Sequence, residues 1–253
     1  RRGLYFYNCE NFTVRYFAHK KNVSGSLANS MVTSIYQDPR GQMWFGTWDG
    51  LSKLNRNTWT FENYTIQNPI DSLHGRCVSA ITQDKDGSFW LGTWRGIIHF
   101  DTNTKKSKHY YHKKLYTLET LNEQVRTIFF DSKGQLWAGS WGCGLRKYNK
   151  QNDDFDIILF PNDTTFNQIN DMIEDAEGLF WLATDAALIC YDPNNGNYRI
   201  YRNNDYSNQG FTSYPATSIL RDDNLGMWIG TLSKSGLFYF NRRQKFTERH
   251  YLP

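Results

Sequence analysis

The residues best suited to bind a ligand follow one recurring step in the chain. A tryptophan stands directly after Gly-Thr or Gly-Ser three times, at Trp48, Trp94 and Trp141. Asp185 and Leu232 take the same place in two later copies of the step. Aromatic rings offer flat faces that stack on a sugar ring, and nearby carboxylate or guanidinium groups hydrogen-bond to its hydroxyl or carboxylate groups. This pattern predicts a carbohydrate-binding surface made from several copies of one turn.

Charged residues accompany these tryptophans. Asp49 and Arg95 each follow a tryptophan, and Asp185 replaces one. Arg76 and Arg126 lie at or near the start of a predicted β-strand, as the polar residues Glu123 and Asn170 also do. The predicted ligand-binding residues are Trp48, Asp49, Arg76, Trp94, Arg95, Arg126, Trp141 and Asp185. A structural alternative stays open, in which the indoles cover neighbouring strands and the charged side chains form a solvated rim.

Recognisable catalytic and metal-binding patterns are missing from the sequence. The histidines form no motif, and there is no Gly-x-Ser-x-Gly segment or phosphate-binding glycine loop. The four cysteines are widely separated, which argues against a zinc site. Asp84-Lys-Asp-Gly87 has calcium-type residues, but the related segments lack its second Asp, so turn capping explains it better. We expect no metal, no cofactor and no catalytic residue.

The composition of the chain narrows its class. Its 253 residues include 29 Lys and Arg against 25 Asp and Glu, a net charge of +4 that is too balanced for electrostatic nucleic-acid binding. Aromatic residues make up 17 %, which excludes a disordered chain. No apolar run approaches the roughly 18 residues of a membrane helix, so we expect no membrane insertion by this segment. The start at Arg1-Arg2-Gly3 suggests a piece of a longer protein.

A repeated sequence motif predicts the β-strands and turns that must position these residues. Its typical form is Asp-x-x-Gly-x-x-Trp-x-Gly-Thr, and its tryptophans recur every 44 to 47 residues. They are Trp44, Trp90, Trp137, Trp181 and Trp228. Each copy indicates four short strands, A to D, with an Asp-x-x-Gly turn between A and B and a Gly-Leu step that opens C in most copies. Strand B is apolar on both faces, so each sheet needs cover on both sides.

Sheets of this kind satisfy one another by stacking around an axis, which predicts an all-β fold, a β-propeller of four-stranded antiparallel blades. We expect five complete blades and a leading half blade. The predicted half blade spans residues 3–18, and the blades span about 30–65, 77–112, 124–160, 168–202 and 215–252. The whole chain, 1–253, is read as one propeller segment.

The segment from Ser26 to Thr47, followed by Gly50-Leu51 and a turn opened by Asn55, resembles a known family. It is similar to the two-component regulator propeller repeats found in the sensor regions of hybrid histidine kinases of gut Bacteroidetes. That resemblance implies seven-bladed rings in tandem, so the chain would be an arc of a larger propeller. The fourth and fifth copies depart from the pattern at Ala183, Ala187 and Leu225, which predicts altered turns there.

The resemblance also implies a function. It points to a periplasmic sensor segment of a hybrid two-component system, with the kinase outside this chain and an oligosaccharide from polysaccharide breakdown as the signal. The expected partners are further propeller blades, other sensor domains and a second copy in a homodimer. One alternative is a scaffold that dimerises without binding ligand. A second is an enzyme similar to propeller lyases, with His74 or His112 as base and a metal ion.

Overall fold

The computed structural model describes residues 2–66, 76–111, 123–160, 164–201, 215–222, 226–232, 236–241 and 246–250. Antiparallel β-sheets dominate, and a short 3-10 helix, η3 (Thr164–Asn167), precedes one of them. The chain divides into two compact units, Arg1–Ile128 and Phe129–Pro253, and the division falls within β11 (Gln124–Phe130). Among the described residues, no helix is both long and apolar enough to cross a membrane.

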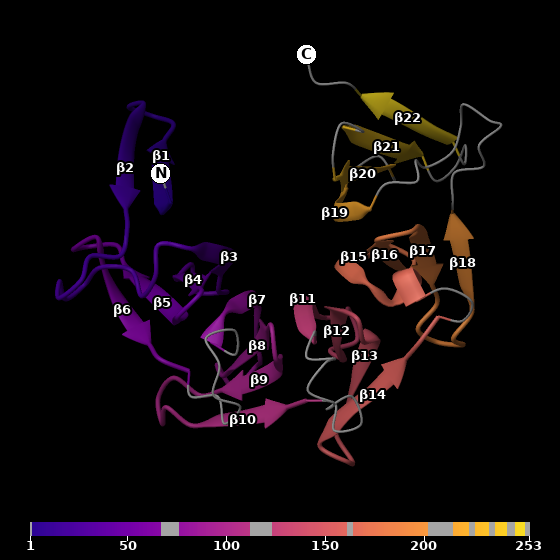
Figure 1. Cartoon of the computed structure of the whole chain (residues 1–253), viewed down its shortest axis with the longest axis horizontal. Helices are drawn as coiled ribbons and strands as arrows, with labels where there is room; N and C mark the ends of the chain where they lie inside the picture. The colour runs from indigo at the N-terminus through magenta and orange to yellow at the C-terminus, as the bar shows by residue number, and fades with distance from the viewer. Residues whose placement is uncertain are drawn as a thin grey trace. The chain divides into compact units, whose positions relative to one another are not determined.

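The first unit contains a two-stranded sheet followed by two four-stranded sheets (Figure 1). Consecutive strands pair in each sheet, so every connection within a sheet is a hairpin. The two-stranded sheet consists of β1 (Leu4–Asn8) and β2 (Thr13–Phe17). The next consists of β3 (Val32–Gln37), β4 (Met43–Thr47), β5 (Gly50–Asn55) and β6 (Thr60–Tyr64). The third consists of β7 (Val78–Gln83), β8 (Phe89–Thr93), β9 (Gly96–Phe100) and β10 (Ser107–Tyr110).

The second unit continues the same arrangement. After β11 come β12 (Leu136–Trp141), β13 (Gly144–Asn149) and β14 (Asp154–Ile158). Two more four-stranded sheets follow. The first contains β15 (Ile169–Glu174), β16 (Phe180–Thr184), β17 (Leu188–Tyr191) and β18 (Tyr198–Tyr201). The last contains β19 (Ala216–Arg221), β20 (Gly226–Thr231), β21 (Leu237–Asn241) and β22 (Phe246–His250). The predicted all-β class, built of four-stranded antiparallel blades, is confirmed.

The repeated aspartate ties the turn between strands A and B to the core. Asp131 accepts the backbone N–H groups of Lys133 and Gln135 on Oδ1, at 2.9 and 2.8 Å. Its Oδ2 accepts the indole N–H of Trp137 at 2.9 Å. The carbonyl of Asp131 also accepts the N–H of Gly134, which confirms the predicted Asp-x-x-Gly turn. The same carboxylate–indole contact occurs at Asp38–Trp44, Asp84–Trp90 and Asp175–Trp181.

A side chain in strand A links each of several sheets to the next. The register of β3 shifts between Val32 and Ser34, and the residue in this bulge, Thr33, donates to the carbonyl of Val78 at 2.7 Å. Its counterpart Ser79 donates to the carbonyl of Val125 in the same unit. In the second unit, the amide of Asn170 donates to the carbonyl of Ala216 at 2.9 Å. These contacts hold neighbouring A strands side by side.

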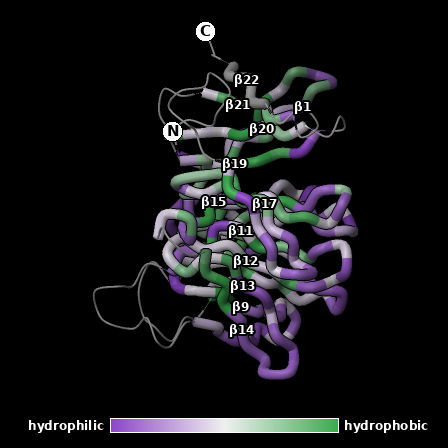
Figure 2. Tube along the Cα trace, turned by 90° about the vertical axis from the view of Figure 1, so that its right-hand side faces the viewer, coloured by the Kyte–Doolittle hydropathy of each residue, from purple (hydrophilic) through white to green (hydrophobic). Residues whose placement is uncertain are grey.

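The core of each unit lies between sheets. Every residue of β8 and of β16 is buried, which confirms that strand B is covered on both faces. In the first unit Trp44 contacts Phe89 of the next sheet, with ring centroids 4.5 Å apart. In the second, Trp181 packs against Phe240 in the same way, at 5.5 Å. Figure 2 shows hydrophobic stretches along strands such as β12 and β20, and hydrophilic residues in many connecting turns.

The atypical fourth copy has the altered turn that its sequence predicts. Where strand C opens with a glycine, that residue has a positive φ, +99° at Gly50 and +98° at Gly96. Only glycine adopts this conformation readily, and a Cβ at Gly50 would lie 2.4 Å from the carbonyl oxygen of Tyr64. Ala187 is not among the residues with positive φ. The fifth copy's Leu225 lies outside the described residues, and Gly226 begins β20 instead of closing the turn.

Candidate functional site

A hydroxyl in each repeat shapes the turn between strands B and C, where the predicted site lies. Thr47 donates from Oγ1 to the carbonyl of Gly50 at 3.0 Å, and Thr93 donates to Gly96 at 2.9 Å. Equivalent bonds are made by Ser140, Thr184 and Thr231. The same hydroxyl accepts the N–H two residues on, at Asp49 and Arg95 in the first unit. The repeat therefore presents the residue after Thr or Ser at the tip of an ordered turn.

The first unit brings two of the predicted tryptophans together. The rings of Trp48 and Trp94 meet edge to face, with centroids 5.3 Å apart and an interplanar angle of 65°. Trp48 is 39 % exposed, whereas Trp94 is half-buried. The edge-to-face contact holds the two rings at a fixed angle and leaves part of Trp48 accessible. An accessible indole fixed in this way can stack on an apolar ring face of a ligand.

Asp49, the residue after Trp48, forms an ion pair with Arg76, which precedes β7 of the next sheet. Nη1 of Arg76 is 3.4 Å from Oδ1 of Asp49, and both side chains are partly exposed. Asp49 also lines a hollow of about 340 Å³, together with His19, Asn63 and most residues of the chain segment 20–28. Arg76 can turn its remaining N–H groups to an acceptor, and Asp49 retains a second carboxylate oxygen, so the pair offers both donors and an acceptor.

Two further predicted arginines lie in the same unit but play different parts. Arg95 is half-buried, and its backbone bridges to Glu123. The N–H of Gly96 bonds to the carbonyl of Glu123 at 3.2 Å, so the turn is anchored to the chain segment that leads into β11. Arg126 is exposed and donates to the side chain of Gln124 at 3.2 Å. It occupies the bulge position where other copies have Thr33, Ser79 or Asn170.

The second unit contains the remaining two predicted residues in a hydrogen-bonded cluster. The indole N–H of Trp141 donates to Oδ2 of Asp185 at 3.1 Å. The amide of Asn170 donates to Oδ1 of the same carboxylate at 2.7 Å, and also to the carbonyl of Ala216. Both carboxylate oxygens of Asp185 thus accept bonds from the protein itself. This cluster fits the structural alternative better than the ligand-binding one.

The other predicted features are placed only in part. Four long connections are predicted on the same side. Those at residues 66–77, 112–124 and 202–214 lie largely outside the described residues, and the fourth, 161–168, is described from residue 164 on. His74 and His112 of the catalytic alternative also lie outside the described residues. In the described part of the chain, no three His, Cys, Asp or Glu side chains gather to hold a metal ion. The carboxylates Asp84 and Asp86 bond to their own turn instead.

Sequence reasoning missed the residues that line the hollow beside Asp49. Nδ1 of His19 donates to the carbonyl of Leu27 at 2.8 Å, and the side-chain amide of Asn63 donates to the carbonyl of Ser26 at 2.8 Å. These bonds bring the connection after β2 against the end of β6. No repeated signal marks either residue. The connection that contains His19 follows the two-stranded sheet and has no full counterpart in the other copies, and the position of Asn63 in β6 holds different residues in the other blades.

The fold and the recurrent Asp–Trp contact define a β-propeller repeat protein. Residues 26–49, 72–95 and 121–142 match the family described as two component regulator propeller. Three of the five copies of the repeat therefore match this family's model, in line with the resemblance seen in the sequence. No curated protein sequence matches the chain significantly.

Solved structures with the same fold include extracellular domains of bacterial hybrid two component systems. One, from B. thetaiotaomicron and described as part of a hybrid two component system, is 17 % identical with a TM-score of 0.75 over 94 % of this chain and 32 % of its own. A second from the same organism, with the same description, is 23 % identical with a TM-score of 0.72, over 96 % and 31 %. This chain therefore spans about a third of the length of these domains.

Virginiamycin B lyase from Staphylococcus aureus has a similar fold as well. The identity is 11 % and the TM-score 0.74, over 98 % of this chain and 76 % of the lyase. At this identity the likeness concerns the fold alone, since propellers support many unrelated activities. The predicted resemblance to lyases is therefore a resemblance of fold alone.

Proposed function

We propose that this chain is a ligand-sensing part of the periplasmic sensor region of a hybrid two-component system, and that it responds to an oligosaccharide released from a polysaccharide. It binds its ligand without transforming it, and the kinase activity belongs to another part of the protein. The repeat family and the similar extracellular domains support the sensor role.

One observation carries the ligand-binding part of the proposal. The edge-to-face pair Trp48–Trp94 leaves an indole accessible, and Asp49, which follows Trp48 in the same turn, pairs with Arg76. A sugar has apolar C–H faces and a ring of hydroxyl groups, so it needs both a flat aromatic surface and mixed donors and acceptors. The first unit supplies both within one pair of neighbouring sheets.

Ligand binding would act by shifting the equilibrium between two arrangements of whole domains. Neighbouring sheets that are joined by buried side chains and hydrogen bonds resist internal change, so a signal must come from different affinities for two placements of such domains. Further propeller repeats and other sensor domains of the same protein are the proposed partners, together with a second copy of the protein.

Calorimetric titration of this chain with a panel of neutral and acidic oligosaccharides tests the proposal. The best binder is then titrated against Trp94→Ala, which removes the aromatic pair, and against Trp94→Phe, which keeps a ring. We expect Trp94→Ala to weaken binding about tenfold or more and Trp94→Phe to weaken it much less. Unchanged affinity in Trp94→Ala, with an unchanged circular dichroism spectrum, would refute binding at this pair.

The scaffold alternative has its own supporting observation. One face of the β1–β2 sheet packs on Trp59 and Phe61 through Phe6 and Phe17. The opposite face exposes aromatic side chains, including Tyr5 at 53 %. Such a surface favours association with another protein surface. Light scattering of Tyr5→Lys decides this role: a dimer that becomes monomeric supports it, and a wild-type chain that is already monomeric contradicts it.

A further inference from the structure

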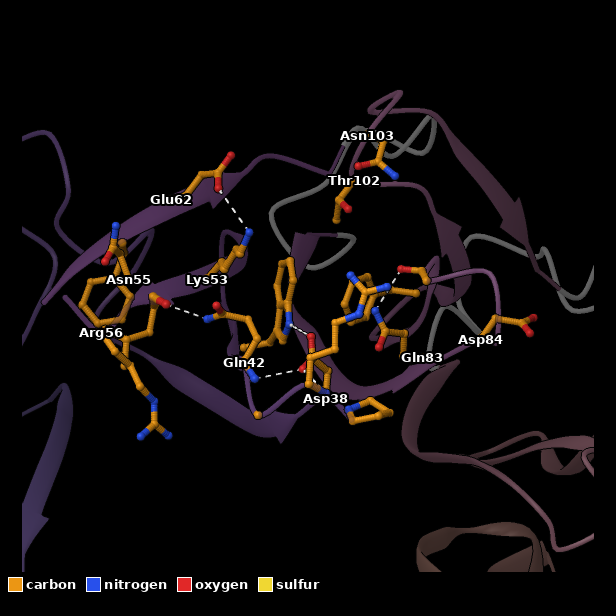
Figure 3. Close-up of a pocket in the computed structure, with 18 of the residues that line it drawn as sticks. Asp38, Gln42, Lys53, Asn55, Arg56, Glu62, Gln83, Asp84, Thr102 and Asn103 are labelled. Atoms are coloured by element: carbon orange, nitrogen blue, oxygen red, sulfur yellow. Dashed lines mark hydrogen bonds and ion pairs between the residues drawn. The ribbon is translucent and has the colours of Figure 1, made fainter. Parts of the chain in front are cut away.

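A second groove lies at the other end of the strands in the first unit. It occupies about 1010 Å³ between the β3–β6 sheet and the β7–β10 sheet, where the A–B and C–D turns emerge. Figure 3 shows Gln42 and Asp38 on one side, Thr102 and Asn103 above them, and Arg56 and Asp84 toward opposite ends. The B–C turns with Trp48 and Trp94 lie at the opposite end of these antiparallel strands.

The second unit bridges the equivalent positions with hydrogen bonds. The backbone N–H and the hydroxyl of Ser132 donate to the two carboxylate oxygens of Glu174, at 2.7 and 2.6 Å. Nζ of Lys133 donates to the side chain of Asn194. Three bonds thus fasten the A–B turn of one sheet to the next sheet.

The first unit cannot form the same bridge. The repeat places Pro39 where Ser132 stands, and Gln83 where Glu174 stands. Proline has neither an N–H group nor a hydroxyl, so both donors are lost. Gln83 instead donates to the carbonyl of Gly87 at 2.9 Å within its own turn. The first unit therefore lacks the Ser132–Glu174 type of bridge, because both bridging residues are replaced in its copies of the repeat.

The charged side chains that line the groove differ in whether they already have a partner in the protein. Asp38 and Asp84 accept bonds from their own turns and from the Trp44 and Trp90 indoles. Asp86 bonds to Ser88, and Glu62 pairs with Lys53 at 3.8 Å. Three cations remain. They make no ion pair or side-chain hydrogen bond with any residue that the structure describes: Arg40, Arg56 and Lys85.

The neutral lining determines the kind of anion that fits. Its aromatic members are inaccessible, with Trp44 at 4 %, Phe61 at 6 % and Phe89 at 0 % exposure, so the groove offers no exposed aromatic ring. The accessible lining is a nearly even mixture of polar and apolar atoms, and its polar part includes the side-chain amides of Asn57 and Asn103. Such groups match a polyhydroxylated chain, and guanidinium and ammonium groups match its carboxylates.

We propose that this groove binds an acidic oligosaccharide, one whose sugar units carry carboxylate groups. The site is separate from the Trp48–Trp94 surface and does not depend on it. Titration of this chain with a short oligogalacturonate, and with a neutral galactan oligosaccharide of the same length, tests the proposal. We expect the acid to bind at least about tenfold more tightly, and its affinity to fall as the salt concentration rises.

Variants in the groove locate the binding. Arg40→Gln combined with Lys85→Gln removes two exposed charges and should weaken acid binding about tenfold or more. Lys133→Gln changes the copy of Arg40 in the bridged position of the second unit, so it is a matched control that should bind as the wild type does. Pro39→Ser combined with Gln83→Glu restores the bridging groups and adds a negative charge, which must also weaken binding.

Three results would overturn the inference. Equal affinity for the acidic and neutral oligosaccharides would remove the role of the cations. Wild-type affinity in the Arg40→Gln, Lys85→Gln variant would place the ligand elsewhere. If Trp94→Ala alone abolished acid binding, the ligand would sit at the Trp48–Trp94 surface, and the proposed sensing function would survive without the groove.

Discussion

Replacing Asp131 with alanine should destabilise the second unit strongly. The carboxylate is 8 % exposed and accepts three hydrogen bonds, two from the turn and one from Trp137, which is 1 % exposed. Loss of the acceptor leaves the buried indole N–H unpaired, at a cost of about 1–3 kcal/mol. The turn amides regain water in part but lose a charged acceptor, which adds about 2 kcal/mol. We therefore expect the free energy of unfolding to fall by roughly 3–5 kcal/mol.

Urea unfolding followed by far-ultraviolet circular dichroism measures this loss. Asp131→Asn keeps one acceptor oxygen and should cost roughly half as much. In a Trp137→Phe background the indole donor is already gone, so Asp131→Ala should cost about 1–2 kcal/mol less than in the wild type. A loss below about 1 kcal/mol, or costs that add within about 0.5 kcal/mol, would refute the idea that the Asp–Trp contact couples turn and core.

Three further outcomes follow from buried groups. Burial raises the pKa of Asp171, which also accepts backbone N–H groups, so its contribution to stability is greatest below its unfolded value of 3.8 and is lost as pH rises through the folded value. Urea unfolding of wild type and Asp171→Asn across acidic pH should show that difference, and parallel curves would contradict it. Burial likewise raises the pKa of the Cys77 thiol to about 11, so iodoacetamide at pH 8 should modify exposed Cys9 far faster, as mass spectrometry can measure. Gly46→Ala should cost about 1–3 kcal/mol of unfolding free energy, because its Cβ would lie 2.3 Å from the carbonyl oxygen of Val78; an unchanged urea midpoint would disprove that clash.

The strands and turns were predictable because their causes are local. Asp38 and Gly41 specify a turn through their own backbone preferences, and the apolar run at Met43–Phe45 requires cover on both faces. Because this pattern of turns and strands is repeated, the four-stranded sheets could be predicted without knowledge of any contact between residues distant in the sequence. The altered turn at Ala187 followed from the same logic, since an alanine there disfavours a positive φ.

The candidate site was less predictable because its partners are distant in sequence. Equivalent positions predict equal roles for Trp48 and Trp141, yet Trp48 contacts Trp94 while Trp141 donates to Asp185. That difference depends on which residue the adjacent sheet presents, not on the turn itself. The groove at Pro39 has a signal in the sequence, because proline removes the hydrogen-bond donors from one copy of a turn. The effect of that loss becomes clear only by comparison with the hydrogen bonds of Ser132 in the second unit.

The bulge contacts of the A strands bear on how such chains lengthen. Thr33 and Ser79 each donate to a main-chain carbonyl of the neighbouring sheet. Every amino acid has a main-chain carbonyl, so a duplicated repeat would find a hydrogen-bond acceptor in any repeat that neighbours it. Tandem expansion of these arrays then requires no matched pair of mutations, and new copies are free to diverge at their exposed turns first.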